Sequence, residues 1–587
     1  MDIIERLEQH AREKPSQLVY RYLIDGENKT EELTYRELLD KVKLLAGSLH
    51  ARVAPGGKAL LLYTPGLSFI ITYLACLYAG ITPVPTYPPL PRRLESELHR
   101  LEMICQDSKP EWVFLDQLTA RILKAAFMKE GLFNAVKKLF FMKIEDFSCF
   151  PMLPRFITEG IEENQPLTAP LRNPDGIAFI QYSSGSTNLP KGVIVTRDNL
   201  SHNLEHERIN LGLSPESITV TWLPHYHDMG LIGFMLCTIE VGFQTVFMSP
   251  LKFIEKPVRW LQAMSKYRAT HGGAPNFGFE LTLRDLKKRE PLQLDLSSLE
   301  LVLCGAEPIN PTLPDRFYQA LKKYGWGEGV FFPAYGLAEN TLTASTGPKG
   351  RPPIVKTFNS EKLQALEAKE CQEGTSLVSC GKALDLHELA IVDPDTREEQ
   401  PQGKGGEIWL KGPSVARGYL NKPDLTENSF HAYTTAEKGP FLRTGDMGFI
   451  HEDELYLFGR IKDLIIVHGK KYAPQDIEFT VQNAHEGIRK GNVAAFSVAG
   501  TSSEQLVIVA EKSDAFPETE NQNILNSILQ STTRTFQLPL KEIVLIKPRT
   551  ISKTTSGKIQ RHSVKNLYLA HKLQVVANWF SPRQRIT

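Results

Sequence analysis

The chain has 587 residues, of which 42% are hydrophobic and 23% are charged, a composition typical of globular domains. This length exceeds what one hydrophobic core normally holds, so we expect at least two domains. The 68 basic and 67 acidic residues leave a net charge of only +1. Such a balance gives no long-range field for nucleic acid or an anionic membrane, so any polyanion must bind at a local site.

The seven cysteines are scattered and include no C-x-x-C pair, which indicates neither a disulfide framework nor a zinc site. A reducing cytoplasm is the predicted compartment. Residues 1–6 read as an acidic amphipathic helix rather than a basic leader, so we expect no signal peptide. Pro65 and Gly66 interrupt the apolar stretch 59–79, which predicts a buried strand, a turn and a buried helix rather than a membrane span.

A helix is predicted to begin near Tyr35. Thr34 and Glu37 have the spacing of a capping box, and Leu33 and Leu38 that of a hydrophobic staple, ahead of an apolar-periodic run to about residue 49. Farther along, short runs rich in Val, Ile and Leu alternate with helical patterns, as at 178–182, 299–303 and 407–410. This alternation predicts an α/β protein with parallel layers.

One domain boundary is expected at the charged turn 459–463, which separates two β-like runs. It divides the chain into a large N-terminal domain, residues 1–460, and a small C-terminal domain, residues 461–587. The second part has an ordinary domain size.

A loop rich in serine and glycine follows the strand predicted at 178–182. Small residues let backbone N–H groups approach phosphate oxygens, hydroxyls add donors, and a lysine neutralises charge, which together suit a triphosphate. The spacing is not that of a Walker loop, and a flexible connector is the alternative. The candidate phosphate-binding residues are Ser183, Ser184, Gly185, Ser186, Thr187 and Lys191.

This loop resembles the phosphate-binding signature of the adenylate-forming superfamily, which includes acyl-CoA synthetases, luciferases and peptide-synthetase adenylation domains. The remaining signatures follow in the same order as in that superfamily, at residues 305–308, 335–339, 406–408, 443–446, 459–463 and 556–559. The resemblance spans nearly the whole chain. It implies an N-terminal adenylating domain of layered α/β and distorted β-barrel subdomains, with a small mobile α+β lid.

The resemblance also implies roles for individual residues of an ATP site. Glu339 is expected to hold the Mg²⁺ that bridges the phosphates, since carboxylate oxygens suit this ion. Asp446 is expected to accept hydrogen bonds from both ribose hydroxyls, with help from Arg460. A helix cap, a turn residue and a surface arginine are the respective alternatives. The rest of the nucleotide site is expected to comprise Gly305, Ala306, Glu307, Ala334, Tyr335, Gly336 and Leu337.

Lys558 is the residue that the resemblance implies for adenylation, because a fixed cation offsets the charge that builds as a carboxylate attacks the α-phosphate. The alternative is that residues 553–558 form a basic, solvated tail. His227 aligns with a histidine that relatives place beside the carboxylate and α-phosphate, although a core histidine is also possible. We expect no zinc at His225, His227 and Asp228, because a strand-like segment would turn only two of them to one side.

Two positions depart from the superfamily pattern. Asn188 stands where most relatives have glycine, but asparagine tolerates left-handed backbone, so the loop is expected to keep its shape. Lys462 stands where many relatives have a hinge aspartate. We expect it to be the hinge that brings Lys558 over the site for adenylation and withdraws it for acyl transfer.

Residues 222–233, 377–381 and 412–419 look specifically like the fatty acyl-AMP ligases. These relatives pass the acyl group to the phosphopantetheine thiol of an acyl carrier protein rather than to coenzyme A. Their distinguishing insertion is expected near residues 352–375, where a longer surface loop is the alternative. The expected partner is a separate holo acyl carrier protein, or a carrier domain of a polyketide or peptide synthase.

The fatty acid is expected to lie in an apolar tunnel, since only about 0.8 kcal/mol per buried methylene is available to hold the chain. Residues of this kind would also suit an ordinary core. The candidate tunnel residues are Met229, Gly230, Ile232, Gly233, Phe277 and Gly278.

Three functions from different classes therefore compete. The first is an acyl-AMP ligase that serves a carrier protein, the second an acyl-CoA synthetase, and the third a catalytically silent regulator that binds an adenylate. The presence of Glu339, Asp446 and Lys558 disfavours the third function. Neither binding to nucleic acid nor stable membrane insertion is expected.

Overall fold

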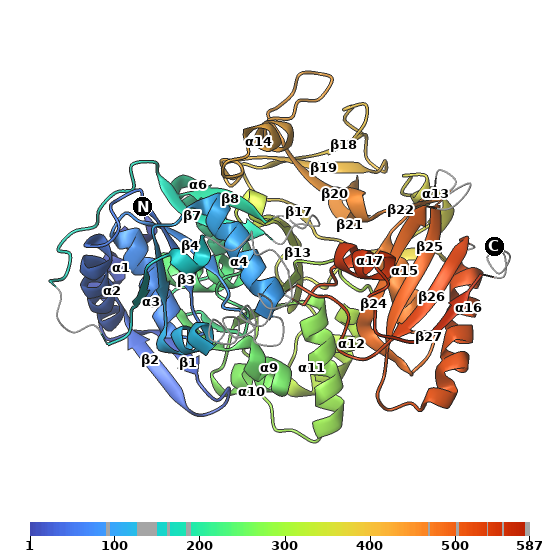
Figure 1. Ribbon diagram of the computed structural model, residues 1–587, viewed down its shortest axis with the longest axis horizontal. Coiled ribbons are helices and arrows are strands. Elements are labelled where there is room, and N and C mark those ends of the chain that lie inside the picture. The colour runs from blue at the N-terminus through green and yellow to red at the C-terminus, as the bar shows by residue number, and fades with distance from the viewer. Residues whose placement is uncertain are drawn as a thin grey trace, which may run out of the picture.

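A computed structural model describes residues 1–89, 94–125, 149–160, 165–183, 190–467, 470–499, 504–536, 538–554 and 557–581. The N-terminal residues form several sheets with helices packed between them, and the C-terminal residues, in orange and red, lie at one end of the long axis (Figure 1). Among the described residues, every helix is too short or too polar to cross a bilayer.

A nine-stranded sheet dominates the N-terminal part. Its six central strands run parallel, and an antiparallel strand or pair closes each edge. In spatial order the strands are β17 (Lys382–Ala383), β14 (Thr343–Thr346), β13 (Phe331–Gly336), β12 (Leu301–Gly305), β11 (His271–Pro275), β9 (Ile218–Thr221), β10 (Gln244–Met248), β1 (Leu18–Leu23) and β2 (Thr30–Thr34).

A second, four-stranded sheet is entirely parallel. Its strands in order are β4 (Thr82–Thr86), β3 (Lys58–Leu62), β5 (Trp112–Leu115) and β6 (Arg155–Ile157). The helices associated with the two sheets include α1 (Ile3–Glu13), α2 (Tyr35–His50), α3 (Leu67–Tyr78), α4 (Leu94–Ser108), α6 (Arg197–Leu211), α8 (Cys237–Val241), α9 (Pro250–Glu255), α10 (Arg259–Lys266), α11 (Asn276–Arg289) and α12 (Leu313–Leu321).

Two local predictions are confirmed. The capping box is present, because Thr34 accepts a hydrogen bond from the backbone of Glu37 while the Glu37 carboxylate accepts one from the backbone of Thr34, and α2 runs to His50. The apolar stretch 59–79 forms β3, a turn and the buried helix α3. Both elements were predictable because neighbouring residues determine them.

The predicted layered α/β class is confirmed, but one detail of the strand assignment was wrong. Of the three runs taken as parallel strands, only 299–303 falls in a parallel strand, β12. The run 178–182 lies in β7 (Ile177–Ser183), which pairs antiparallel with β8 (Lys191–Thr196). The run 407–410 lies in β19 (Gly406–Lys411), inside an antiparallel sheet with β18 (Glu388–Val392), β20 (Leu442–His451) and β21 (Glu454–Arg460).

The C-terminal residues have a hydrophobic cluster of their own, which extends from Ile465 to Leu545 and supports the proposed boundary near residue 460. The chain leaves β21, passes through the short helix η6 (Ile461–Asp463) and enters this part. Its strands are β22 (Ile465–Val467), β23 (Lys470–Tyr472), β24 (Ile488–Ala499), β25 (Glu504–Lys512), β26 (Leu540–Ile546) and β27 (Val575–Phe580), and its helices are α15 (Pro474–Gln482), α16 (Asn521–Phe536) and α17 (Arg561–Leu569).

The segment 352–375, proposed as an insertion, contains the strand β15 (Val355–Phe358) and the helix α13 (Ser360–Gln364), and ends at the start of β16 (Thr375–Val378). Phe358 and Leu363 are buried in one cluster with Phe449, Tyr456 and Leu464. The segment therefore packs on β20 and β21 and against the residue that follows the proposed hinge.

Candidate active site

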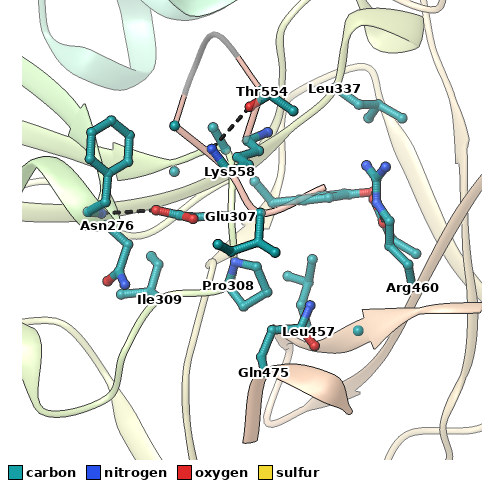
Figure 2. Close-up of a pocket in the computed structure, with 18 of the residues that line it drawn as sticks. Asn276, Glu307, Pro308, Ile309, Leu337, Leu457, Arg460, Gln475, Thr554 and Lys558 are labelled. Carbon is teal, nitrogen blue, oxygen red and sulfur yellow. Dashed lines mark hydrogen bonds and ion pairs between the residues drawn. The ribbon is translucent and has the colours of Figure 1, made fainter. Parts of the chain in front are cut away.

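A large cleft of about 2400 Å³ opens where the parallel strands β11, β12 and β13 end, and residues from both parts of the chain line it. The carboxyl ends of parallel strands are the usual place for ligands in α/β proteins, because loops and helix starts converge there. Figure 2 shows Glu307, Arg460 and Lys558 around this pocket, although they are far apart in the sequence. The candidate residues that line the cleft are Lys191, His227, Gly305, Ala306, Glu307, Ala334, Tyr335, Gly336, Leu337, Glu339, Asp446, Arg460, Lys462 and Lys558.

The loop after β12 forms one wall of the cleft. Ala306 has a φ of +69°, a left-handed conformation that costs an alanine about 1–2 kcal/mol and that the neighbouring strands must hold in place. The next residue, Glu307, turns back and accepts a hydrogen bond of 3.0 Å from the backbone N–H of Phe277. Burial raises the pKa of the Glu307 carboxyl.

Asp446, in the middle of β20, is the centre of a hydrogen-bonded group. Tyr335 donates its hydroxyl to one carboxylate oxygen at 2.8 Å, and Nε of Arg460 donates to the other at 2.8 Å. The charge of Asp446 raises the pKa of Arg460. Each carboxylate oxygen can accept more than one hydrogen bond, so two ribose hydroxyls can still be bound.

Glu339 lies in the short helix η5 (Ala338–Asn340), which begins two residues after the end of β13. Tyr419 donates its hydroxyl to the Glu339 carboxylate at 2.9 Å, and the ammonium of Lys191 lies 4.9 Å from the centre of the Tyr419 ring. Burial and the charge of Lys462 lower the pKa of Lys191, whereas Glu339 acts in the opposite direction. Lys191 is thus held beside both an acid and another cation.

Most of the serine-rich loop falls outside the described residues, which include neither Ser184, Gly185, Ser186 nor Thr187. The residues that flank the loop are described. Ser183 is the last residue of β7 and Lys191 the first of β8, and their backbones are paired in the antiparallel hairpin. The loop therefore starts and finishes at the cleft wall that carries Lys191.

Lys558 reaches the cleft from the C-terminal part of the chain. The adjacent Gly557 has a φ of +85°, and a Cβ there would lie 2.6 Å from the ring of Phe277, so this loop is seated directly on the N-terminal part. Burial and the charge of Arg460 lower the pKa of Lys558, while Asp228, Glu307 and Asp446 act in the opposite direction. The lysine thus sits among carboxylates that can keep it charged.

Arg561 secures the loop that carries Lys558. Its guanidinium makes two hydrogen bonds of 2.7 Å to the carboxylate of Glu478 in α15 and lies 3.2 Å from Asp463 in η6. All three side chains are mostly buried. A bidentate arginine–carboxylate pair fixes both distance and orientation, so the Lys558 loop is tied to the hinge region and to α15.

His227 and Asp228 face the same cleft. Nδ1 of His227 lies 2.6 Å from the Asp228 carboxylate. Although burial opposes it, the charges of His227 and Lys558 lower the pKa of Asp228. The residues around His227 form a turn that leads into a helix, not the strand-like segment that was expected, because β9 ends at Thr221.

His225 is a core residue. Its Nε2 accepts a hydrogen bond of 3.2 Å from the backbone N–H of Gly66, and its ring stacks on Phe69. Burial lowers the pKa of His225 to about 4, so the ring is neutral at ordinary pH.

The candidate tunnel residues separate into two groups. Met229, Gly233 and Phe277 line the cleft. Gly230, Ile232 and Gly278 pack in the layer behind, where a Cβ on Gly230 would meet the carbonyl of Pro224 and one on Gly278 the ring of Trp222. These glycines therefore allow close packing behind the wall and do not provide the wall itself.

Sequence reasoning assigned no role to Asp228, Tyr419 or Arg561, although all three hold candidate catalytic side chains in place. Tyr419 ends a stretch that resembles the family, and this was the one available signal. The other two contacts depend on packing: Arg561 meets a residue 83 positions away in the sequence. No local pattern could have revealed that pairing.

Comparison with known families gives two matches that together span most of the chain. Residues 7–420 match the family model described as AMP-binding enzyme. Residues 462–578 match the AMP domain of Disco-interacting protein 2-like proteins. The second match begins at Lys462, the proposed hinge residue.

Among curated proteins, the chain is 35% identical over 577 residues to the medium-chain-fatty-acid–[acyl-carrier-protein] ligase JamA of Moorena producens, covering 97% of this chain and 95% of the relative. It is 32% identical to the long-chain-fatty-acid–AMP ligase FadD23 of Mycobacterium tuberculosis, covering 93% and 92%. It is also 33% identical to the putative fatty-acid–CoA ligase FadD21 of M. tuberculosis, covering 95% and 96%.

Solved structures give a similar result. The fatty acyl-adenylate ligase from Legionella pneumophila, in complex with acyl adenylate and pyrophosphate, is 35% identical, with a TM-score of 0.71 and coverage of 99% and 98%. A structure from a study of fatty acyl-adenylate ligases from E. coli and L. pneumophila has a TM-score of 0.85 at 27% identity, with coverage of 97% and 98%.

The first prediction concerns Lys558. Lys558→Met should lower the rate of pyrophosphate release from ATP and a fatty acid about a hundredfold or more, because the cation that offsets developing charge is lost. Lys547→Met, at an exposed position on the same side of the hinge, is the control. A Lys558→Met enzyme that keeps near-wild-type pyrophosphate release would contradict the role.

The second prediction concerns Arg561, a positioning residue. Arg561→Met should slow adenylation about tenfold or more, since two buried carboxylates lose their partner and the Lys558 loop loses its anchor. Acyl transfer from supplied acyl-AMP should change much less, because it does not use Lys558. Arg549→Met serves as the control, since Arg549 is 77% exposed and its ion pair is 3.9 Å long. Equal losses in both half-reactions would show that Arg561 acts only on stability.

Proposed function

Because the chain belongs to the AMP-binding enzyme family and, within it, to the fatty acyl-AMP ligases, we propose that it activates a fatty acid with ATP and passes the acyl group to an acyl carrier protein. The observation that carries this proposal is the seating of Lys558 in the cleft, within electrostatic range of Arg460, Asp446 and Asp228. A cleft that gathers cations beside a ribose-binding carboxylate suits the α-phosphate of ATP.

In the first half-reaction, a carboxylate oxygen of the fatty acid attacks the α-phosphorus of ATP. The new bond joins the acyl oxygen to phosphorus, the bond to the bridging oxygen of the β-phosphate breaks, and pyrophosphate leaves with the electron pair. Lys558 offsets the negative charge on the oxygens around the α-phosphorus, and Lys191 that on the departing phosphates. His227, oriented by Asp228, completes the polar wall beside the reacting groups.

Glu339 fits a magnesium ion. Only one hydrogen bond to its carboxylate, that from Tyr419, is found among the described residues, and oxygen ligands of this kind are what a hard cation requires. Bound Mg²⁺ supplies neutralisation of the ATP phosphate oxygens. The Tyr419 hydroxyl then orients the carboxylate, because it occupies one oxygen and leaves the other for the metal.

In the second half-reaction, a thiolate attacks the acyl carbonyl carbon, the bond to the phosphate oxygen breaks, and AMP leaves. We propose that the thiol belongs to the phosphopantetheine of a separate holo acyl carrier protein or of a carrier domain in a synthase. The similarity to JamA, which is named an acyl-carrier-protein ligase and is 35% identical to this chain, supports a carrier protein as the acceptor. Rotation about Lys462 would withdraw Lys558 and open the approach for the thiol.

Coenzyme A is the competing acceptor, because FadD21, which is named a putative fatty-acid–CoA ligase, is 33% identical to this chain. The packing of residues 352–375 favours the carrier protein, because Phe358 and Leu363 are buried together with Leu464 just after the hinge. A segment packed there can obstruct the productive use of coenzyme A while leaving the rotation that both acceptors need. A catalytically silent regulator that only binds an adenylate would not require Lys558 to be held in the cleft.

The test of the proposal is a product assay with a panel of fatty acids and ATP, run with coenzyme A and separately with holo carrier protein. We expect pyrophosphate release, accumulation of acyl-AMP, little acyl-CoA and efficient carrier loading, followed by mass spectrometry. Efficient formation of acyl-CoA would overturn the choice of acceptor. An absence of pyrophosphate with every acid would overturn adenylation itself.

A further prediction tests the segment 352–375. The double substitution Phe358→Ala with Leu363→Ala removes its two buried anchors, so it should raise acyl-CoA formation several-fold while carrier loading is retained. Leu386→Ala, at a residue that is 77% exposed, is the control. Unchanged acyl-CoA formation in a folded double variant would show that the segment does not restrict the acceptor.

A further inference from the structure

The lining of the cleft continues along one face of the large sheet, and we call this inner part the tunnel. Gly305, Leu303 and Leu301 alternate along β12, so their side-chain positions point to the same face, and all three line the cavity. At the inner end, Leu301 is paired with His271, and His271 with Thr219, across three neighbouring strands. These residues also line the cavity.

The length of this tunnel suits a fatty acyl chain. Gly305 and Leu301 are four residues apart on a strand, which corresponds to about 13 Å. An extended chain advances roughly 1.2 Å per bond, so the tunnel holds on the order of ten carbons beyond the reacting carboxyl group.

Helix α6 passes along the tunnel and contributes an acid to its wall. Glu207 lines the cavity and is only 2% exposed. One turn farther on, Leu211 also lines the cavity, and its carbonyl oxygen lies 2.9 Å from Nε2 of His271 at the inner end. Glu207 therefore precedes the inner end by about one helical turn, roughly 6 Å, and is part of the tunnel wall.

Only one of the two carboxylate oxygens of Glu207 has a hydrogen-bond partner among the described residues. Thr343 donates its hydroxyl to one carboxylate oxygen, and no other described residue makes a hydrogen bond with the second. The other polar side chains at the inner end are satisfied: His271 contacts the Thr270 hydroxyl and the Leu211 carbonyl, and Thr219 contacts Thr245. A buried carboxyl with an unpaired oxygen is unfavourable in a tunnel that holds only methylene groups.

We propose that Glu207 binds a hydroxyl group carried part-way along the acyl chain, so that the preferred substrates are hydroxylated fatty acids. The inference rests on the proposed fatty-acid adenylation. A hydroxyl both donates and accepts, so it can pair with Glu207 in either protonation state. Both states are available near neutral pH, because burial raises the pKa of Glu207 to about 7.

The test compares one saturated straight-chain acid with isomers that carry a single hydroxyl at successive positions of the same chain. Wild-type enzyme should use one isomer, or two adjacent ones, about tenfold better in kcat/KM for pyrophosphate release than the parent acid, as expected for a hydrogen bond to a buried acid. The other isomers should be poorer than the parent, because their hydroxyls are buried without a partner.

The matched variant replaces the acid and its donor together, as Glu207→Leu with Thr343→Val, so that neither partner is left unpaired. The preference for the hydroxylated isomer should disappear and the parent acid should become the better substrate. Thr343→Val alone leaves the carboxyl in place and should keep the preference.

Two results would overturn the inference: a wild-type enzyme that uses the parent better than every isomer, or a folded double variant that keeps the isomer preference. If the double variant does not fold, the comparison of the parent acid with its isomers in wild-type enzyme still tests the inference, because it needs no substitution. Release of pyrophosphate with the parent but no hydroxyl preference defeats only this inference. If no acid gives pyrophosphate release, the proposed function itself is overturned, and the inference that rests on it is overturned as well.

Discussion

The crowding of positive charge in the cleft is the constraint on which the rest of the site depends. The charge of Arg460 adds to burial in lowering the pKa of Lys558, and the charge of Lys462 adds to burial in lowering that of Lys191. Such a group is stable only beside anions. Asp446 and Asp228 supply part of the compensation, and the triphosphate of ATP supplies the rest, which explains why binding of the nucleotide and assembly of the site favour one another.

The same constraint couples the two parts of the chain. The residues that hold the Lys558 loop all lie beyond residue 460. Arg561 binds Glu478 and Asp463, and so ties the loop to the proposed hinge as one unit. Among the described residues, the contact of Gly557 with Phe277, the burial of Leu464 beside Phe358 and the charges in the cleft hold that unit to the N-terminal part. In the proposed reaction, the departure of pyrophosphate removes negative charge from the cleft and so weakens the electrostatic reason for the docked arrangement.

The part of the site proposed for the acyl chain depends on hydrophobic burial rather than on charge. Burial of methylene groups supplies affinity in small, equal increments of about 0.8 kcal/mol, so an apolar tunnel distinguishes neighbouring chain lengths weakly. A single buried hydrogen-bonding group distinguishes much more strongly, because the wrong substrate leaves it unpaired. Glu207 gives this tunnel such a group at a defined depth, between the reacting end at Gly305 and the inner end at Leu301.

The sequence by itself determined the features that neighbouring residues specify. The capping box at Thr34 and Glu37, the strand and helix of residues 58–78 and the order of the family signatures could all be recognised without coordinates. The tertiary structure decided the antiparallel pairing of β7 with β8, the anchoring of Arg561 and the burial of Glu207. The physical reason is distance along the chain: Glu207 meets Thr343 from 136 residues away, and only the packing of α6 against the sheet brings the two together.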